Sequence, residues 1–146
     1  MASVFDVANW FLHHNKFLRN FLDQDTDEIS NLKLQKLLYY AQGSYLALKG
    51  KPLFYDPIEA WKHGPVVKAV YKKYCDFGAS GINRLEYYQL EDEEKEVLLK
   101  VYNRFGGYSA WGLRNLTHSE TPWKETDQLS EISQEKIKKY FKKHYV

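Results

Sequence analysis

The sequence predicts a mainly α-helical protein, a compact single-domain bundle of about six helices around a central buried helix, with room for a small two-stranded β element. Three observations lead to this prediction. Residues 32–50 carry the longest hydrophobic repeat with helical spacing, and shorter repeats with capping residues lie on both sides of it. The 146 residues also suit one domain, which would bury about 70% of its unfolded surface. We therefore treat 1–146 as a single domain.

The stretch 32–50 is expected to be the central helix. Asn31 is expected to cap its start and Gly50 its end. Gly43 lies in the helix interior, where glycine is unfavourable, so we expect another backbone to pass close to it. The apolar positions that repeat along one face are Leu34, Leu37, Leu38, Ala41, Tyr45 and Leu48.

The residues before the central helix predict a short first helix and a loop. Ser3 and Asp6 form an S-x-x-D helix start, and apolar residues follow at helical spacing as far as Phe11. The pattern weakens at 13–15, after which 17–22 could add a turn or two. The polar stretch 23–30 is expected to be a loop.

The middle of the chain predicts a buried loop over 50–57, held in place by its aromatic side chains, and a short strand over 58–62. His63, Gly64 and Pro65 are expected to form a turn, with the proline as the first residue of a helix that ends near Gly78. Residues 84–90 alternate weakly and could pair with 58–62 as a small ribbon.

The last third of the chain predicts three more helices. Four acids at 91–94 suit the first turn of a helix that ends at the Gly106-Gly107 pair. Ser109 and Ser133 are expected to cap the next two helices, and Pro122 is expected to make an extended break between them.

Composition excludes several classes of protein. The net charge of +2 and the pI near 8.5 are too mild to indicate a nucleic-acid binder. The single cysteine, Cys75, excludes an internal disulfide and a multi-cysteine metal site, which suits a reducing cytoplasm. No basic and apolar leader and no apolar run of 18 residues is present, so we expect a cytoplasmic protein without a membrane span.

The sequence carries none of the motifs that bind phosphate, dinucleotide or zinc, or that present a serine nucleophile. Adjacent His13 and His14 would point about 100° apart on a helix and could not share a metal without other ligands. We therefore expect no enzyme activity, no cofactor and no metal.

Two alternatives remain open. One is a hydrolase or nuclease that uses His118 with Glu120 as a general base.

The other alternative is a module that binds phosphate, a membrane surface or an acidic partner through the cationic face of the last helix. The lysines of this face are Lys136, Lys138, Lys139, Lys142 and Lys143. Cations near a helix C-terminus also have a structural explanation, because they interact favourably with the helix dipole.

Three sequence blocks, taken in order, resemble the Panacea domain family, also called the SocA-like antitoxin or GepA (genetic element protein A) phage-associated family. The blocks are Leu32-Lys-Leu-Gln-Lys-Leu-Leu-Tyr-Tyr-Ala-Gln-Gly43, then Pro52-Leu-Phe54 with Glu59-Ala-Trp-Lys-His-Gly-Pro-Val-Val67 and Val70-Tyr71, then Leu116-Thr-His-Ser-Glu-Thr-Pro-Trp123. The resemblance covers roughly residues 3 to 128.

The resemblance implies an antitoxin of a toxin-antitoxin system, associated with prophages or mobile elements and encoded beside its toxin gene. Family members bind their toxins directly, and at least one kind delivers its toxin to a cytoplasmic ATP-dependent protease. This chain has no room for the helix-turn-helix that some members carry, so DNA binding is not expected. A homodimer through exposed rings stays open. The residues expected to contact the toxin are Tyr39, Tyr40, Trp61, His63, Pro65, His118 and Trp123.

Overall fold

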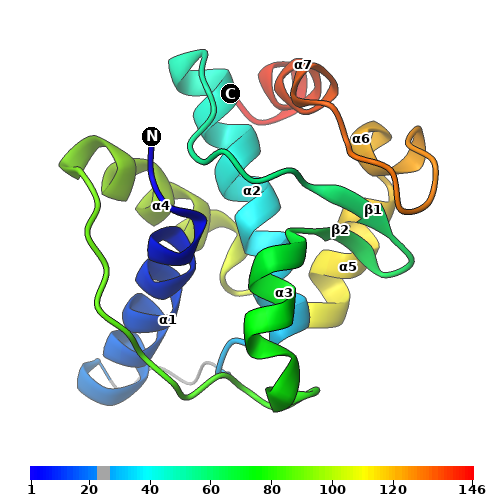
Figure 1. Cartoon of the computed structure of the whole chain (residues 1–146). Coiled ribbons are helices and arrows are strands. Elements are labelled where there is room, and N and C mark those ends of the chain that lie inside the picture. Colours follow the sequence, from blue (N-terminus) through cyan, green and yellow to red (C-terminus); the bar gives the residue numbers. More distant parts are fainter. Residues whose placement is uncertain (23–26) are drawn as a thin grey trace.

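The computed structural model describes residues 1–22 and 27–146 and confirms the mainly α-helical prediction. Helix α2 (Asn31–Lys49) passes through the middle of the molecule (Figure 1). It is packed by α1 (Val4–Phe21), α4 (Asp92–Phe105), α5 (Ala110–His118) and α7 (Gln134–His144). Fourteen of its nineteen residues are buried, so the predicted central buried helix is confirmed.

The smaller elements lie on one side of α2. Strands β1 (Glu59–Trp61) and β2 (Gly64–Val66) form a hairpin, followed by α3 (Lys68–Tyr74) and the 3₁₀ turn η1 (Cys75–Phe77). The hairpin, α5 and the short helix α6 (Thr121–Lys124) are neighbours in space (Figure 1). None of the helices in the described ranges is long and apolar enough to cross a membrane.

The ends of α2 follow ordinary capping chemistry. The Ser30 hydroxyl accepts a hydrogen bond from the Lys33 backbone N–H at 3.2 Å, so Ser30 is the cap and Asn31 is the first helical residue. Gly50 ends the helix with a φ of 77°, as predicted. The expected cap at Asn31 was wrong by one residue.

Gly43 is required by a side chain and not, as expected, by a backbone. A Cβ atom built on Gly43 would lie 2.4 Å from two ring carbons of Phe141 in α7. This contact allows α7 to lie directly against α2, with Phe141 fully buried. A glycine in a helix interior indicates that some group lies close to it, but the sequence pattern does not identify that group as a side chain or a backbone.

Gly43→Ala is therefore expected to lower the free energy of unfolding by about 1–3 kcal/mol, the usual cost of overpacking a core. Urea denaturation monitored by circular dichroism would measure the change. Gly107→Ala is the matched control, because a Cβ atom there meets nothing within 4 Å. Equal stability of the two variants would contradict the assigned contact.

The strand predicted at 58–62 is present as β1, but its predicted partner was wrong. β1 pairs antiparallel with β2, with Ala60 opposite Pro65 and Trp61 opposite Gly64. Gly64 has a φ of 112°, which makes the tight reversal possible. Residues 84–90 form no strand, because α1 supplies partners for their backbone. The Asn9 side chain accepts from the Glu86 N–H at 2.9 Å.

Three further boundaries differ from the predictions. Pro65 lies in β2 and the next helix starts at Lys68, while Pro122 lies in the first turn of α6 and not in an extended break. The first helix continues without interruption through His14, whose ring stacks on that of Trp10 with 4.8 Å between centroids. Of the loop expected at 23–30, residues 23–26 lie outside the described residues.

Candidate functional site

Three tyrosine hydroxyls, two of them from buried residues, converge on the carboxylate of Glu120, the residue that precedes α6. Tyr39 and Tyr40 of α2 donate to it at 2.9 and 3.1 Å, and Tyr145 donates from the residue after α7. Glu120, Tyr39 and Tyr40 are fully buried. We call these four residues the tyrosine clamp. It joins α2, the start of α6 and the C-terminal residues.

Burial is the main influence on the pKa values of the clamp residues. Burial raises the pKa of Glu120, although the three hydroxyl hydrogen bonds act in the opposite direction. Burial and then the Glu120 charge raise the pKa values of Tyr39 and Tyr40. The phenols therefore stay protonated as donors. The side chains of Tyr39 and Tyr40 have no exposed surface, so the partner surface that we propose does not include them.

His118 and Glu120 do not meet as the hydrolase alternative requires. The His118 ring stacks on Trp123, with 3.8 Å between centroids and 7° between planes. Burial lowers the pKa of His118, and the neighbouring charges of Arg114, Lys36 and His63 lower it further. Its Nε2 atom is buried and has no hydrogen-bond partner among the described residues. The two side chains therefore have different surroundings and different partners.

Lys36 is a buried cation in the central helix. Its side chain is 0% exposed, and its Nζ donates to the Pro65 carbonyl at 3.2 Å. Burial, and then the charge of Arg114, lower its pKa from 10.5 to about 7. Pro65 itself is buried, so it contributes through this carbonyl. A Cβ atom on Gly64 would lie 2.6 Å from Lys36 Cε, which shows how closely the hairpin covers α2.

The remaining predicted residues lie near one another beside the hairpin. The Trp123 indole N–H donates to the Trp61 carbonyl at 2.8 Å, which ties α6 to β1. The His63 ring lies 5.6 Å from that of Trp111 in α5, and the Arg114 guanidinium lies 4.4 Å from the centre of the same indole. We call these five residues, Trp61, His63, Trp111, Arg114 and Trp123, the hairpin surface.

Two members of the hairpin surface were missed by sequence reasoning. Trp111 is 53% exposed, and Arg114 follows it by three residues on the same helix face. That i, i+3 spacing of an aromatic and a cation is a signal in the sequence. It could have identified the pair as neighbours, but it could not show that the hairpin lies beside them.

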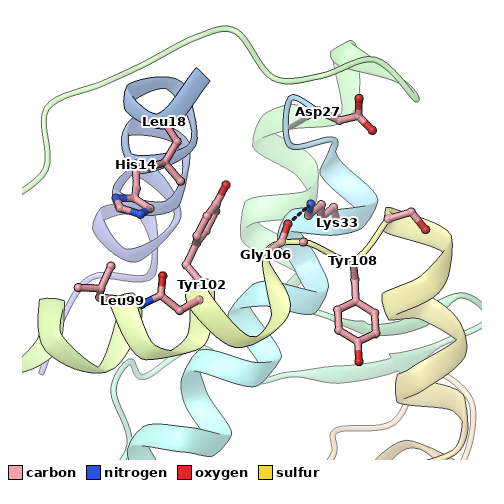
Figure 2. A pocket seen from close by; sticks show the side chains of 11 residues that line it. His14, Leu18, Asp27, Lys33, Leu99, Tyr102, Gly106 and Tyr108 are labelled. Carbon is pink, nitrogen blue, oxygen red and sulfur yellow. Dashed lines mark hydrogen bonds between the residues drawn. The ribbon is translucent and has the colours of Figure 1, made fainter. Parts of the chain in front are cut away.

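A separate pocket of about 670 Å³ lies between α1, α4 and the segment before α5. Figure 2 shows His14, Lys33, Tyr102 and Tyr108 around it. The Lys33 ammonium donates to the Gly106 carbonyl at 2.7 Å, and burial lowers its pKa while the charge of Asp27 raises it. None of the seven residues expected to contact a toxin lines this pocket, and the buried Lys33 ammonium already has a hydrogen-bond partner.

Comparison with known proteins decides the family. The family model described as "Antitoxin SocA-like, Panacea domain" matches residues 34–124, which is more than half of the chain. The chain belongs to this family. The matched range of the Panacea domain includes the hairpin, α5, α6 and every residue expected to contact a partner.

A curated relative of this Panacea-domain protein is "Antitoxin SocA" of Caulobacter vibrioides (strain NA1000 / CB15N). The two are 57% identical over 53 residues, which cover 36% of this chain and 27% of that antitoxin. The match thus spans about a quarter of the relative's own length. No solved structure matches the chain.

Proposed function

We propose that this protein is an antitoxin that neutralises a cognate toxin by binding it directly through the hairpin surface. Membership of the antitoxin family supports the class of function. The observations that carry the proposed site are two contacts between family-matched elements: the Trp123 indole N–H on the Trp61 carbonyl, and the His63 ring beside that of Trp111. Aromatic residues of this kind dominate the binding energy of protein interfaces.

The rings of this surface are held in place before any partner binds. Trp123 is fixed by its bond to the Trp61 carbonyl and by stacking on His118. The Trp61 indole N–H donates to Glu59 at 2.9 Å, and its ring packs 5.1 Å from Tyr71. Fixed rings lose little conformational entropy on binding, so more of the contact energy appears as affinity.

Co-expression with the product of the adjacent gene tests the function. We expect the adjacent gene product alone to stop growth, and the antitoxin to restore growth and to co-purify with that product in a stable complex. A harmless neighbour that does not bind would contradict the proposal. Measuring the lifetime of the toxin with and without the antitoxin in the same cells would test delivery to an ATP-dependent protease, since delivery predicts a shorter lifetime.

Trp111→Ala is expected to weaken toxin binding by about 30-fold or more, because truncation of an aromatic hot spot costs about 2 kcal/mol or more. Stability should change little, since the ring is 53% exposed. Isothermal titration calorimetry on the purified complex partners would measure the affinity. Tyr87→Ala is the matched control, an 82% exposed ring on the segment between η1 and α4. Equal affinities of the two variants would exclude Trp111 from the interface.

A further inference from the structure

Four basic side chains, of which Arg114 and His63 belong to the hairpin surface, lie near one another without an acidic partner among the described residues. Arg114, Lys36 and His63 all lie close enough to His118 for their charges to lower its pKa, and the charge of Arg114 likewise lowers the pKa of Lys36. No ion pair joins any of these four side chains to a carboxylate of the described residues. Because the pKa values of Lys36 and His118 are lowered, the permanent charge among the four is that of Arg114. The fold leaves this charge without a counter-ion among the described residues, and such a charge favours an anion from outside.

Hydrogen bonds hold the Arg114 guanidinium in one orientation but do not use all of its N–H donors. Its Nε donates to His63 Nδ1 at 3.4 Å and its Nη1 to the Asn115 side chain at 3.0 Å. Its Nη2 makes no hydrogen bond to the part of the chain that the structure describes, and the flat group lies over the indole of Trp111. A guanidinium has five N–H donors in a planar fork that matches a carboxylate. Arg114 therefore keeps donors for an incoming anion.

The anion is expected to be a single carboxylate and not a phosphate chain. The Glu59 carboxylate accepts a hydrogen bond from the indole of Trp61, a member of the hairpin surface, so a ligand with negative charges along its length would be repelled there. The protein as a whole carries a net charge of +2. The exposed Trp111 ring beside Arg114 instead suits an amino-acid side chain, whose apolar part can cover the indole.

We propose that Arg114, with His63 beside it and Trp111 flanking it, binds an aspartate or glutamate side chain of the toxin. This inference rests on the proposed antitoxin function and adds the chemistry of the partner. Arg114 then acts as the specificity-determining residue of the hairpin surface. Lysine is a poor substitute, because it offers a point charge in place of a planar fork.

The inference can be tested on the full chain without the toxin. The ¹H–¹⁵N spectrum would be titrated with an acetylated peptide of six glutamates, with its six-glutamine counterpart, and with inorganic phosphate. We expect the glutamate peptide alone to shift the Arg114 Nε–H and Trp111 Nε1–H signals in a saturable manner. Arg114→Gln should remove the Trp111 response. Lys142→Gln, on the exposed face of α7, should leave it unchanged.

The inference is overturned if these signals do not respond, if they respond equally to the glutamine peptide, or if phosphate shifts them more strongly at equal concentration. It is also overturned if Arg114→Gln leaves the Trp111 response intact. With the toxin itself, Arg114→Gln should weaken binding by about 10- to 100-fold, with partial recovery in Arg114→Lys.

The two proposals fail in different ways. An adjacent gene product that binds the original chain and Arg114→Gln equally overturns the carboxylate inference and leaves the antitoxin function standing. A product that fails to bind the original chain overturns the antitoxin function, while the peptide titration still decides whether Arg114 binds carboxylate.

Discussion

Glu120→Ala is expected to lower the free energy of unfolding by about 3–5 kcal/mol, because three tyrosine hydroxyls would lose their acceptor and each buried, unsatisfied group costs about 1–3 kcal/mol. Two of the three donors, Tyr39 and Tyr40, are 0% exposed and so cannot turn to water. In a domain of this size the midpoint of thermal unfolding should fall by roughly 10 °C. Urea and thermal denaturation at pH 7 would measure both effects.

Two variants make this test specific to the tyrosine clamp. Glu125→Ala removes an exposed acid five residues away and should change stability by less than about 0.5 kcal/mol. Glu120→Gln keeps one acceptor oxygen, so its loss should be smaller than that of Glu120→Ala. If Glu120→Ala were as stable as Glu125→Ala, the clamp would not be a major source of stability.

The clamp also predicts a direction for pH dependence. Burial raises the pKa of Glu120 in the folded protein above the 4.5 of the unfolded chain. Folding therefore favours the protonated acid, and the stability linked to this group falls as the pH rises from below 4.5 through the raised value. Denaturation between pH 4 and 7 should show this fall in the original chain. In Glu120→Gln, which cannot titrate, this part of the pH dependence should be absent.

The central helix could be predicted from the sequence because one apolar period determines both its existence and its burial. The partner of β1 could not, since it depends on contacts distant in the chain. Residues 84–90 resemble a strand, yet Asn9 takes up the backbone N–H of Glu86 and so keeps the segment against α1. The hairpin instead follows from the left-handed conformation of Gly64.

The candidate site could be predicted only in part, for a related reason. Aromatic residues in the matching blocks indicate large side chains that contact something, but do not indicate which of them face the core. Tyr39 and Tyr40 contact Glu120 inside the protein, whereas Trp111 is exposed. The distinction depends on the position of α7, whose Phe141 ring packs against the rings of Tyr39 and Tyr40 on α2, whereas Trp111 lies on α5 with its ring half exposed.

Lys36→Met is expected to make the protein more stable at pH 6 and to remove a rise in stability above pH 7. The pKa of Lys36 falls from 10.5 in the unfolded chain to about 7 in the folded protein, which corresponds to about 5 kcal/mol at 1.36 kcal/mol per pKa unit. Between these two values the unfolded chain binds more protons than the folded one. The stability of the original chain therefore rises with pH through this window.

Urea denaturation at pH 6 and pH 9 would measure the effect. The stability advantage of Lys36→Met over the original chain should shrink by roughly 2–3 kcal/mol between the two pH values, since the penalty for charging Lys36 declines over that range. Loss of the hydrogen bond to Pro65 subtracts about 1 kcal/mol at both pH values and so cancels in the comparison.

Lys142→Met, which changes an exposed lysine of α7, supplies the matched control and should follow the original chain at both pH values. A constant difference between Lys36→Met and the original chain would mean that Lys36 stays charged when folded. That outcome would require an anion or water to reach its Nζ between α2 and the hairpin. The pH series therefore also tests how tightly the hairpin closes over α2 beneath the hairpin surface.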